Sequence, residues 1–230
     1  EDAHMKGIDF RREGDGFVLT NGPLELSGEI CEGRLVRNVK VDGQELGCVD
    51  VGLKCSSDGK AWEWPTVLSL ADVRFGETAD VAVLDLWGEW WKKTGAWQID
   101  GLAWRTHVRL EIAPGARRFR VEFVEFLNNG TKPLVIARPF FHVYPPSGLK
   151  PVRHVGALGG ANADAWTVGG RAFGLSSACP GVQKITFWTD VKSGCPHPDC
   201  GFDLPTGMLR LEPWQSCPPP RPLFAEVFGE

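Results

Sequence analysis

Arginine and histidine alternate with apolar residues along positions 104–110 of the chain. In a β-strand every second side chain shares a face, so Arg105, His107 and Arg109 are predicted on one face and the apolar residues on the other. Arginine presents a planar fork to carboxylates, and histidine transfers protons near neutral pH. The segment therefore predicts a strand with one buried face and one face suited to binding anions and moving protons.

Two further segments with strand character follow, at residues 118–126 and 134–144. Pro114-Gly115 and Asn128-Asn129-Gly130, which separate the three runs, are residues typical of turns. Consecutive strands joined by short turns usually pair with one another. We therefore expect a three-stranded antiparallel meander at the centre of a sheet.

The turns also predict how the strands of this meander are paired. A tight turn at Pro114-Gly115 would place His107 opposite Glu122, and pairing of Phe126 with Leu134 would place Glu122 opposite Arg138. Directly opposed side chains on a sheet lie close enough to touch. The expected face carries eight polar residues: Arg105, His107, Arg109, Arg120, Glu122, Arg138, His142 and Tyr144.

This face favours one reaction type if it is a site. Arg105 or Arg138 would neutralise a sugar carboxylate and so make the neighbouring C5 proton easier to remove, as lyases of acidic polysaccharides and sugar epimerases require. The candidate catalytic residues are His107, His142, Tyr144 and Glu122, and the candidate substrate-binding arginines are Arg105, Arg109, Arg120 and Arg138.

Two alternatives stay open at this point. A solvated sheet face also pairs arginine with glutamate, so the same residues fit a structural or interaction surface. Hydrolysis of a glycoside needs two carboxylates flanking the bond. Only Glu122 lies on the expected face, which disfavours hydrolysis, although Asp85, Glu89 and Asp100 on neighbouring segments keep it open.

Tryptophan is abundant, with ten residues in the chain. Trp90, Trp91 and Trp97 flank or lie within a lysine-containing stretch, 91–101, that we expect to be a loop. Since indole rings stack well on sugars, these three side chains are candidate substrate-binding residues. An equally good explanation is that they anchor a folded-back loop by packing.

The cysteines predict neither a metal site nor a cofactor. Cys195 and Cys200 flank a histidine and an aspartate, but their spacing, with two intervening prolines, fits structural zinc sites poorly. A disulfide or free thiols explain them better. Seven cysteines would leave one unpaired in an oxidising compartment; the pattern favours export slightly and leaves a cytoplasmic location open.

Composition predicts one large all-β domain over residues 1–230, a two-sheet antiparallel β-sandwich with little or no helix. Twenty-eight glycines and 17 prolines among aromatic and β-branched runs indicate many short strands joined by turns. A net charge of −4 argues against nucleic acid or an anionic membrane as partner, and leaves a glycan or small sugar. His4-Met5 is typical of a cloning-site remnant covering residues 1–5. Oligomeric state does not follow from the sequence.

Two stretches resemble the galactose-mutarotase-like β-sandwich of aldose epimerases and many carbohydrate-active enzymes. They are residues 19–26, Leu-Thr-Asn-Gly-Pro-Leu-Glu-Leu, and residues 35–41 followed by Asp42-Gly43, joined later by the run from Leu102 to Gly130. The arrangement is also similar to the sandwich domain of exo-rhamnogalacturonan-lyase-like proteins. The resemblance covers about two thirds of the chain and implies a twisted supersandwich whose concave sheet holds sugar. The family's catalytic histidine and glutamate match no particular positions here, so a non-catalytic carbohydrate-binding module is the alternative.

Overall fold

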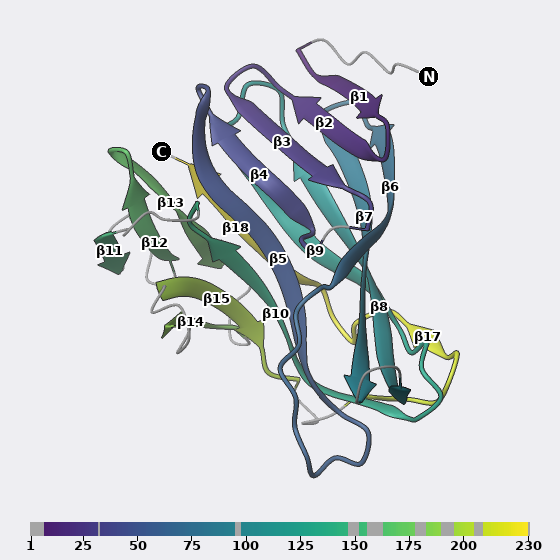
Figure 1. Cartoon of the computed structure of the whole chain (residues 1–230). Coiled ribbons are helices and arrows are strands. Elements are labelled where there is room, and N and C mark those ends of the chain that lie inside the picture. The colour runs from purple at the N-terminus through teal and green to yellow at the C-terminus, as the bar shows by residue number, and fades with distance from the viewer. Residues whose placement is uncertain are drawn as a thin grey trace.

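The computed structural model describes residues 7–31, 33–94, 98–146, 152–155, 163–177, 183–189, 196–204 and 209–229. These residues form two antiparallel sheets and contain no helix (Figure 1). The predicted all-β sandwich is therefore confirmed. No helix in this part of the chain is long and apolar enough to cross a membrane.

The first sheet has nine strands and begins with the N-terminal meander. The Asn21-Gly22 and Asp42-Gly43 turns join consecutive strands there, as predicted. In spatial order the strands are β1 (Asp9–Glu13), β2 (Gly16–Thr20), β3 (Leu24–Glu29), β4 (Val36–Val41), β5 (Gln44–Ser56), β10 (Leu134–Tyr144), β15 (Pro196–Phe202) and β14 (Gln183–Thr189), with β16 (Leu209–Leu211) also paired to β10.

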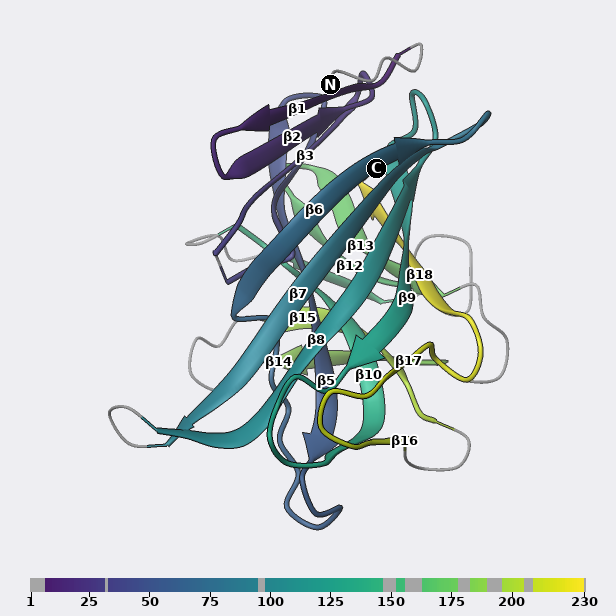
Figure 2. The ribbon, with the colours of Figure 1, turned by 90° about the vertical axis from the view of Figure 1, so that its right-hand side faces the viewer.

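The second sheet also has nine strands and contains the long hairpins of the middle of the chain (Figure 2). In spatial order they are β11 (Val152–Val155), β12 (Ala163–Val168), β13 (Arg171–Ser177), β18 (Leu223–Gly229), β9 (Arg118–Leu127), β8 (Gln98–Ile112), β7 (Ala82–Thr94) and β6 (Ser69–Glu77), with β17 (Ser216–Cys217) also paired to β9.

The expected central meander is wrong in its third strand. β8 and β9 pair as predicted, but β10 leaves that sheet and lies between β5 and β15 in the other one. The side-chain amide of Asn128 organises the crossing, because it donates to the carbonyls of Lys132 (2.9 Å) and Leu211 (3.0 Å). The turn chemistry was recognised correctly, but a six-residue connection permits a change of sheet as readily as a hairpin.

Two segments expected to be loops are strands instead. β7 continues to Thr94 and β8 begins at Gln98, so most of the stretch 91–101, expected to be a loop, belongs to these two paired strands. Residues 196–200 lie in β15, where pairing with both β10 and β14 outweighs the prolines.

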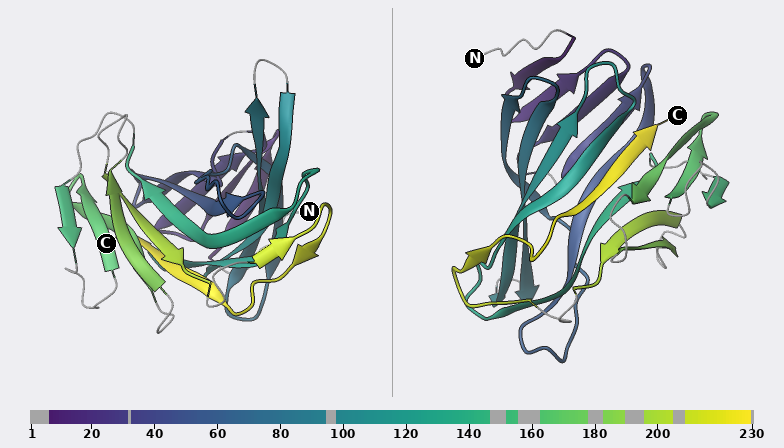
Figure 3. Two further views of the ribbon diagram at one scale, coloured as in Figure 1. Left: turned by 90° about the horizontal axis from the view of Figure 1, so that it is seen from below. Right: turned by 180° about the vertical axis from the view of Figure 1, so that it is seen from behind.

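Apolar side chains from the two sheets meet between the layers. The rings of Phe123 on β9 and Phe141 on β10 stack at 4.3 Å, and Trp104 and Trp166 are fully buried. Both sheets are strongly twisted and curved (Figure 3). Because every second residue of a strand points away from this core, each sheet also has an outer face, and the two outer faces are on opposite sides of the molecule.

One buried asparagine joins the sheets at the end carrying the N-terminal turns. Asn21 donates to the carbonyls of Ala113 (2.9 Å) and Ala116 (3.0 Å) in the β8–β9 turn. Its side-chain oxygen accepts from the Leu24 amide at 3.0 Å. The Asn-Gly sequence therefore specifies both a turn and a contact between the layers.

Candidate functional site

The predicted polar residues are divided between the two outer faces. Arg105, His107, Arg109, Arg120 and Glu122 lie on the outer face of the second sheet, whereas Arg138, His142 and Tyr144 lie on that of the first. The predicted row of His107, Glu122 and Arg138 therefore does not form. The chain has two separate polar clusters.

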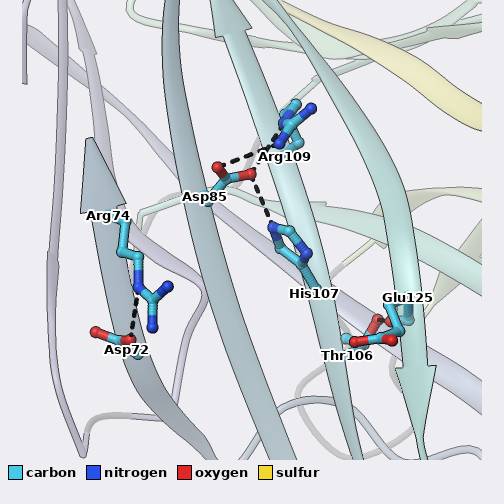
Figure 4. Close-up of polar contacts among 7 residues, drawn as sticks. All are labelled: Asp72, Arg74, Asp85, Thr106, His107, Arg109 and Glu125. Carbon is cyan, nitrogen blue, oxygen red and sulfur yellow. Dashed lines mark hydrogen bonds and ion pairs between the residues drawn. The ribbon is translucent and has the colours of Figure 1, made fainter. Parts of the chain in front are cut away.

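The cluster on the second sheet is centred on Asp85 of β7 (Figure 4). His107 Nε2 lies 2.8 Å from Asp85 Oδ1, and Arg109 donates from Nε to the same oxygen at 2.9 Å and from Nη2 to Oδ2 at 3.3 Å. Partial burial would raise the pKa of Asp85, but the hydrogen bonds from Arg109 and His107 outweigh it and lower the pKa. Asp85 is therefore a stable anion that fixes both partners.

The turn and a bulge both change the pairing predicted between β8 and β9. Arg109, instead of His107, is opposite Glu122, because the connection from Ile112 to Arg118 is longer than a tight turn. The register then shifts between His107 and Val108, so His107 is opposite Glu125. The bulge adds one residue to β9, so Glu125 lies on the outer face beside His107. Strict alternation after Glu122 would have placed Glu125 in the core.

A hollow of about 260 Å³ adjoins His107 on this face. Trp87 lies within it, with the His107 ring stacked on the indole at 4.4 Å and the Arg74 guanidinium 4.8 Å from the same ring. Since β7 lies between β6 and β8, Arg74 and His107 approach the indole from opposite sides. The hollow is lined by Asp72, Arg74, Trp87, Arg105, His107, Glu125 and Leu127.

The structure does not bring the three predicted platform tryptophans together. Trp90 packs against the core with its ring 6.4 Å from that of Trp104. Trp91 is the next residue on β7 and so points to the other face, while Trp97 lies outside the described residues. A sugar platform of Trp90, Trp91 and Trp97 is therefore not formed by the part of the chain that the structure describes.

The cluster on the first sheet is centred on Asp50 of β5, which is completely buried. Arg34 donates to Asp50 Oδ2 at 2.9 Å, and the Val51 amide donates to Oδ1 at 2.9 Å. Burial raises the pKa of Asp50 to about 6, although Arg34, the Val51 amide and His142 act to lower it. A carboxyl that titrates close to neutral pH is characteristic of functional sites.

His142 and Tyr144 lie on β10 directly beside this carboxyl. Asp50 is the register partner of His142, and His142 Nδ1 lies 2.8 Å from the Tyr144 hydroxyl. The Arg34 guanidinium covers the Tyr144 ring at 4.6 Å. His142 is 7% exposed, so Tyr144 and Arg34 are the more accessible members of the cluster.

Aromatic and cationic side chains continue along the same face. Trp64 is 44% exposed and its ring lies 6.0 Å from Phe140, whose ring stacks on His142 at 4.5 Å. The Lys54 ammonium lies 5.0 Å from the Trp64 ring. Aromatic and cationic side chains therefore form a continuous surface next to the Asp50–His142–Tyr144 cluster.

Within the described residues, no three His, Cys, Asp or Glu side chains are placed to hold a metal ion. Cys200 is buried, and Cys195 lies outside those residues. Burial raises the pKa of the Cys48 thiol near Asp50 to about 11, so this cysteine is protonated at neutral pH.

Sequence reasoning missed Asp50 and Arg34 and gave Asp85 only as an alternative. A carboxylate within an apolar strand, Val49-Asp50-Val51, was the available signal for Asp50. Arg34 and Trp64 come from connections outside the strands, and their positions beside β5 and β10 depend on the tertiary fold. Glu125 was hidden by the bulge.

No protein-family model matches the chain, and no curated protein matches it. Among solved structures, it is similar to a candidate aldose 1-epimerase from Klebsiella pneumoniae, with 9% identity and a TM-score of 0.48, over 98% of this chain and 84% of that one. It is also similar to the α-N-acetylgalactosaminidase NagBb from Bifidobacterium bifidum, with 12% identity and a TM-score of 0.44, over 100% of this chain and 36% of that one.

The galactose-mutarotase-like sandwich is an interpretation of the sequence, and these matches concern only the course of the strands. They assign neither an activity nor a ligand to this chain. The link to exo-rhamnogalacturonan-lyase-like proteins stays a prediction.

Proposed function

We propose that this protein binds an acidic sugar on the outer face of β5 and β10 and removes the C5 proton of the bound sugar, as a polysaccharide lyase or sugar epimerase does. The observation that carries the proposal is the ion pair of buried Asp50 and part-exposed Arg34 directly beside the His142–Tyr144 pair. Two groups that can transfer a proton, His142 and Tyr144, therefore lie beside a cation, Arg34, that can bind a carboxylate.

The charge on this face favours an anionic ligand. The face carries three cationic side chains, Arg34, Lys54 and Arg138, and two acidic ones, Asp50 and Asp203. The high pKa of Asp50 keeps part of its population neutral near pH 6. A uronate carboxylate would therefore be attracted, with the exposed Trp64 as a surface on which its ring stacks.

Exposure assigns different roles to the titratable groups. Asp50 is fully buried and acts as a positioning residue for Arg34 and His142. The more accessible Tyr144 hydroxyl would exchange the proton at C5 of the sugar, and His142 would orient that hydroxyl. Removal of this proton with cleavage of the C4–O bond is lyase chemistry, whereas its return to the opposite face is epimerisation.

Exchange at C5 tests both reactions in one experiment. The protein is incubated in D₂O with a panel of polyuronides, and deuterium at C5 and unsaturated uronide products are measured. We expect one or both signals for the wild type and a loss of at least about 100-fold in Tyr144→Phe. Retained turnover in Tyr144→Phe would exclude the assigned role.

The near-complete burial of Asp50 and His142 favours a second function, non-catalytic binding of the same sugars. Binding is measured for the wild type and for Trp64→Ala, which removes the stacking surface. Binding that Trp64→Ala weakens, without any C5 exchange, would establish the binding module. Failure of every acidic glycan to bind would overturn both functions.

A further inference from the structure

A second aromatic side chain is exposed in the turn that leads into β17, the short strand paired with the end of β9. Trp214 is 70% exposed and has a φ of 65°. Left-handed φ values are uncommon outside glycine and are outliers for bulky residues. A tryptophan held in such a conformation and pointing into solvent contributes little to packing, and its indole is available to stack on a ligand.

The backbone of Trp214 is held firmly in this position. Its amide donates to the Asn128 carbonyl at 2.7 Å, and the next residue, Gln215, donates to the Glu212 carbonyl at 3.0 Å. The Asn128 amide in turn donates to the Gln215 carbonyl at 3.0 Å. The turn therefore presents the indole from a fixed platform rather than from a free loop end.

The same turn is joined to the wall of the hollow. Ser216 is the register partner of Leu127, and its hydroxyl donates to Glu125 Oε1 at 2.8 Å. Both Leu127 and Glu125 line the hollow. In Figure 2 the yellow segment that carries β16 and β17 runs alongside the end of β9. Trp214 thus belongs to the rim of the surface that contains His107.

The hollow itself offers polar groups with balanced charge. Asp72 and Glu125 provide carboxylates, and Arg74 and Arg105 provide guanidinium groups. Carboxylates accept hydrogen bonds and guanidinium groups donate them, so vicinal hydroxyls of a sugar find both kinds of partner. Equal numbers of acidic and basic groups give no net attraction for an anion, which distinguishes this surface from the cationic face of β5 and β10.

Trp87 within the hollow cannot provide the stacking surface. Arg74 and His107 cover its two faces, at 4.8 Å and 4.4 Å from the ring. Trp214 therefore supplies the exposed indole on this side, at the rim where a chain longer than one sugar would extend.

We propose that the outer face of β6–β9 is a second carbohydrate site, which binds a neutral oligosaccharide with one ring stacked on Trp214 and a neighbouring ring hydrogen-bonded to Arg105 and Glu125. This site is independent of the acidic-sugar function proposed for β5 and β10. It is non-catalytic, because its role requires only stacking and hydrogen bonding.

The test uses the complete chain and neutral oligosaccharides of glucose, xylose, mannose and galactose, at up to about 10 mM, a range suited to weak sites. Binding is followed by NMR through the indole N–H signals, with the Trp214 signal assigned by its absence in Trp214→Asn. Asparagine tolerates left-handed φ, so this variant removes the indole without imposing strain. Trp64→Ala on the opposite face is the matched control.

We expect at least one oligosaccharide to shift the Trp214 signal and Trp214→Asn to weaken its binding about tenfold. Trp214→Phe should retain most of the affinity, and Trp64→Ala should leave it unchanged. Trp214→Asn should melt at or slightly above the wild-type temperature. Absence of binding across the panel, or wild-type affinity in Trp214→Asn, would overturn the proposal, whatever the outcome for acidic sugars.

Discussion

Substitution of Asp50 by asparagine should abolish a specific pH dependence of stability. The pKa of Asp50 is about 6 in the folded protein, against an ordinary value of 3.8. Burial is the main cause, since the carboxylate loses its hydration and Arg34 compensates only in part. The folded state therefore holds the Asp50 proton more tightly than the unfolded chain does.

The sign and size of the effect follow from this difference. Because the folded pKa is the higher one, the stabilising contribution of protonated Asp50 is complete below about pH 4 and is lost as the pH rises through about 6. At 1.36 kcal/mol per pKa unit, the interval from 3.8 to about 6 corresponds to about 3 kcal/mol. Above pH 7 no further change is expected from this group.

Urea unfolding of the wild type and Asp50→Asn between pH 3.5 and about 8 measures the effect. The two proteins share every other titrating group, so the difference between their unfolding free energies isolates Asp50. We expect the unfolding free energy of Asp50→Asn to rise by about 3 kcal/mol relative to that of the wild type as the pH rises from 3.5 to about 8. In Arg34→Gln the pH-dependent loss of stability should extend to higher pH, because the cation that favours ionised Asp50 is absent.

A pH-independent difference would refute the reasoning, because it would mean that Asp50 has the same pKa folded and unfolded. A difference of opposite sign would mean that Arg34 stabilises the carboxylate more than burial destabilises it. In either case Asp50 would be an ordinary ion-pair partner, and the proposed site would lose its titrating positioning group.

Three further substitutions test other parts of the structure. Asn21→Ala should cost about 2 to 3 kcal/mol in urea unfolding, because it removes two hydrogen bonds between the layers and a third within its own turn; a cost no larger than that of half-buried Asn38→Ala would contradict this. Gly47→Ala should prevent stable folding, since a Cβ would lie 1.9 Å from the Tyr144 carbonyl oxygen. Soluble yield and circular dichroism measure this effect. In the control, Gly76→Ala, the added Cβ meets nothing within 4 Å and the substitution should be nearly neutral. Asp85→Asn should cost about 1 to 2 kcal/mol in unfolding free energy at pH 7. Because the pKa of Asp85 is lowered in the folded state, this cost should shrink as the pH falls below about 4. A cost that persists at pH 2 would show that the charge of Asp85 is unimportant.

Local chemistry explains what sequence reasoning predicted correctly. Turn residues such as Asn21-Gly22 and Asp42-Gly43, and strict alternation in residues 104–110, depend on backbone conformation within a few residues. The outward positions of Arg105, His107 and Arg109 followed from the same alternation. These features require no knowledge of distant parts of the chain.

Register and sheet membership depended on distant contacts. The bulge that exposes Glu125 arises from pairing between β8 and β9, and no turn signal marks it. β10 joins β5 and β15 because its apolar residues are buried there, and this separates His142 from His107. A strand pattern does not specify which of two sheets a strand will enter.

The sequence by itself determined most of the strands, most of their turns and an alternating arginine and histidine face on β8, because these follow from local periodicity. The tertiary structure alone decided that the polar residues form two clusters on opposite outer faces. It also buried Asp50 beside His142 and Tyr144 and placed Trp214 at the rim of the hollow, because pairing across more than 70 residues brings these segments together.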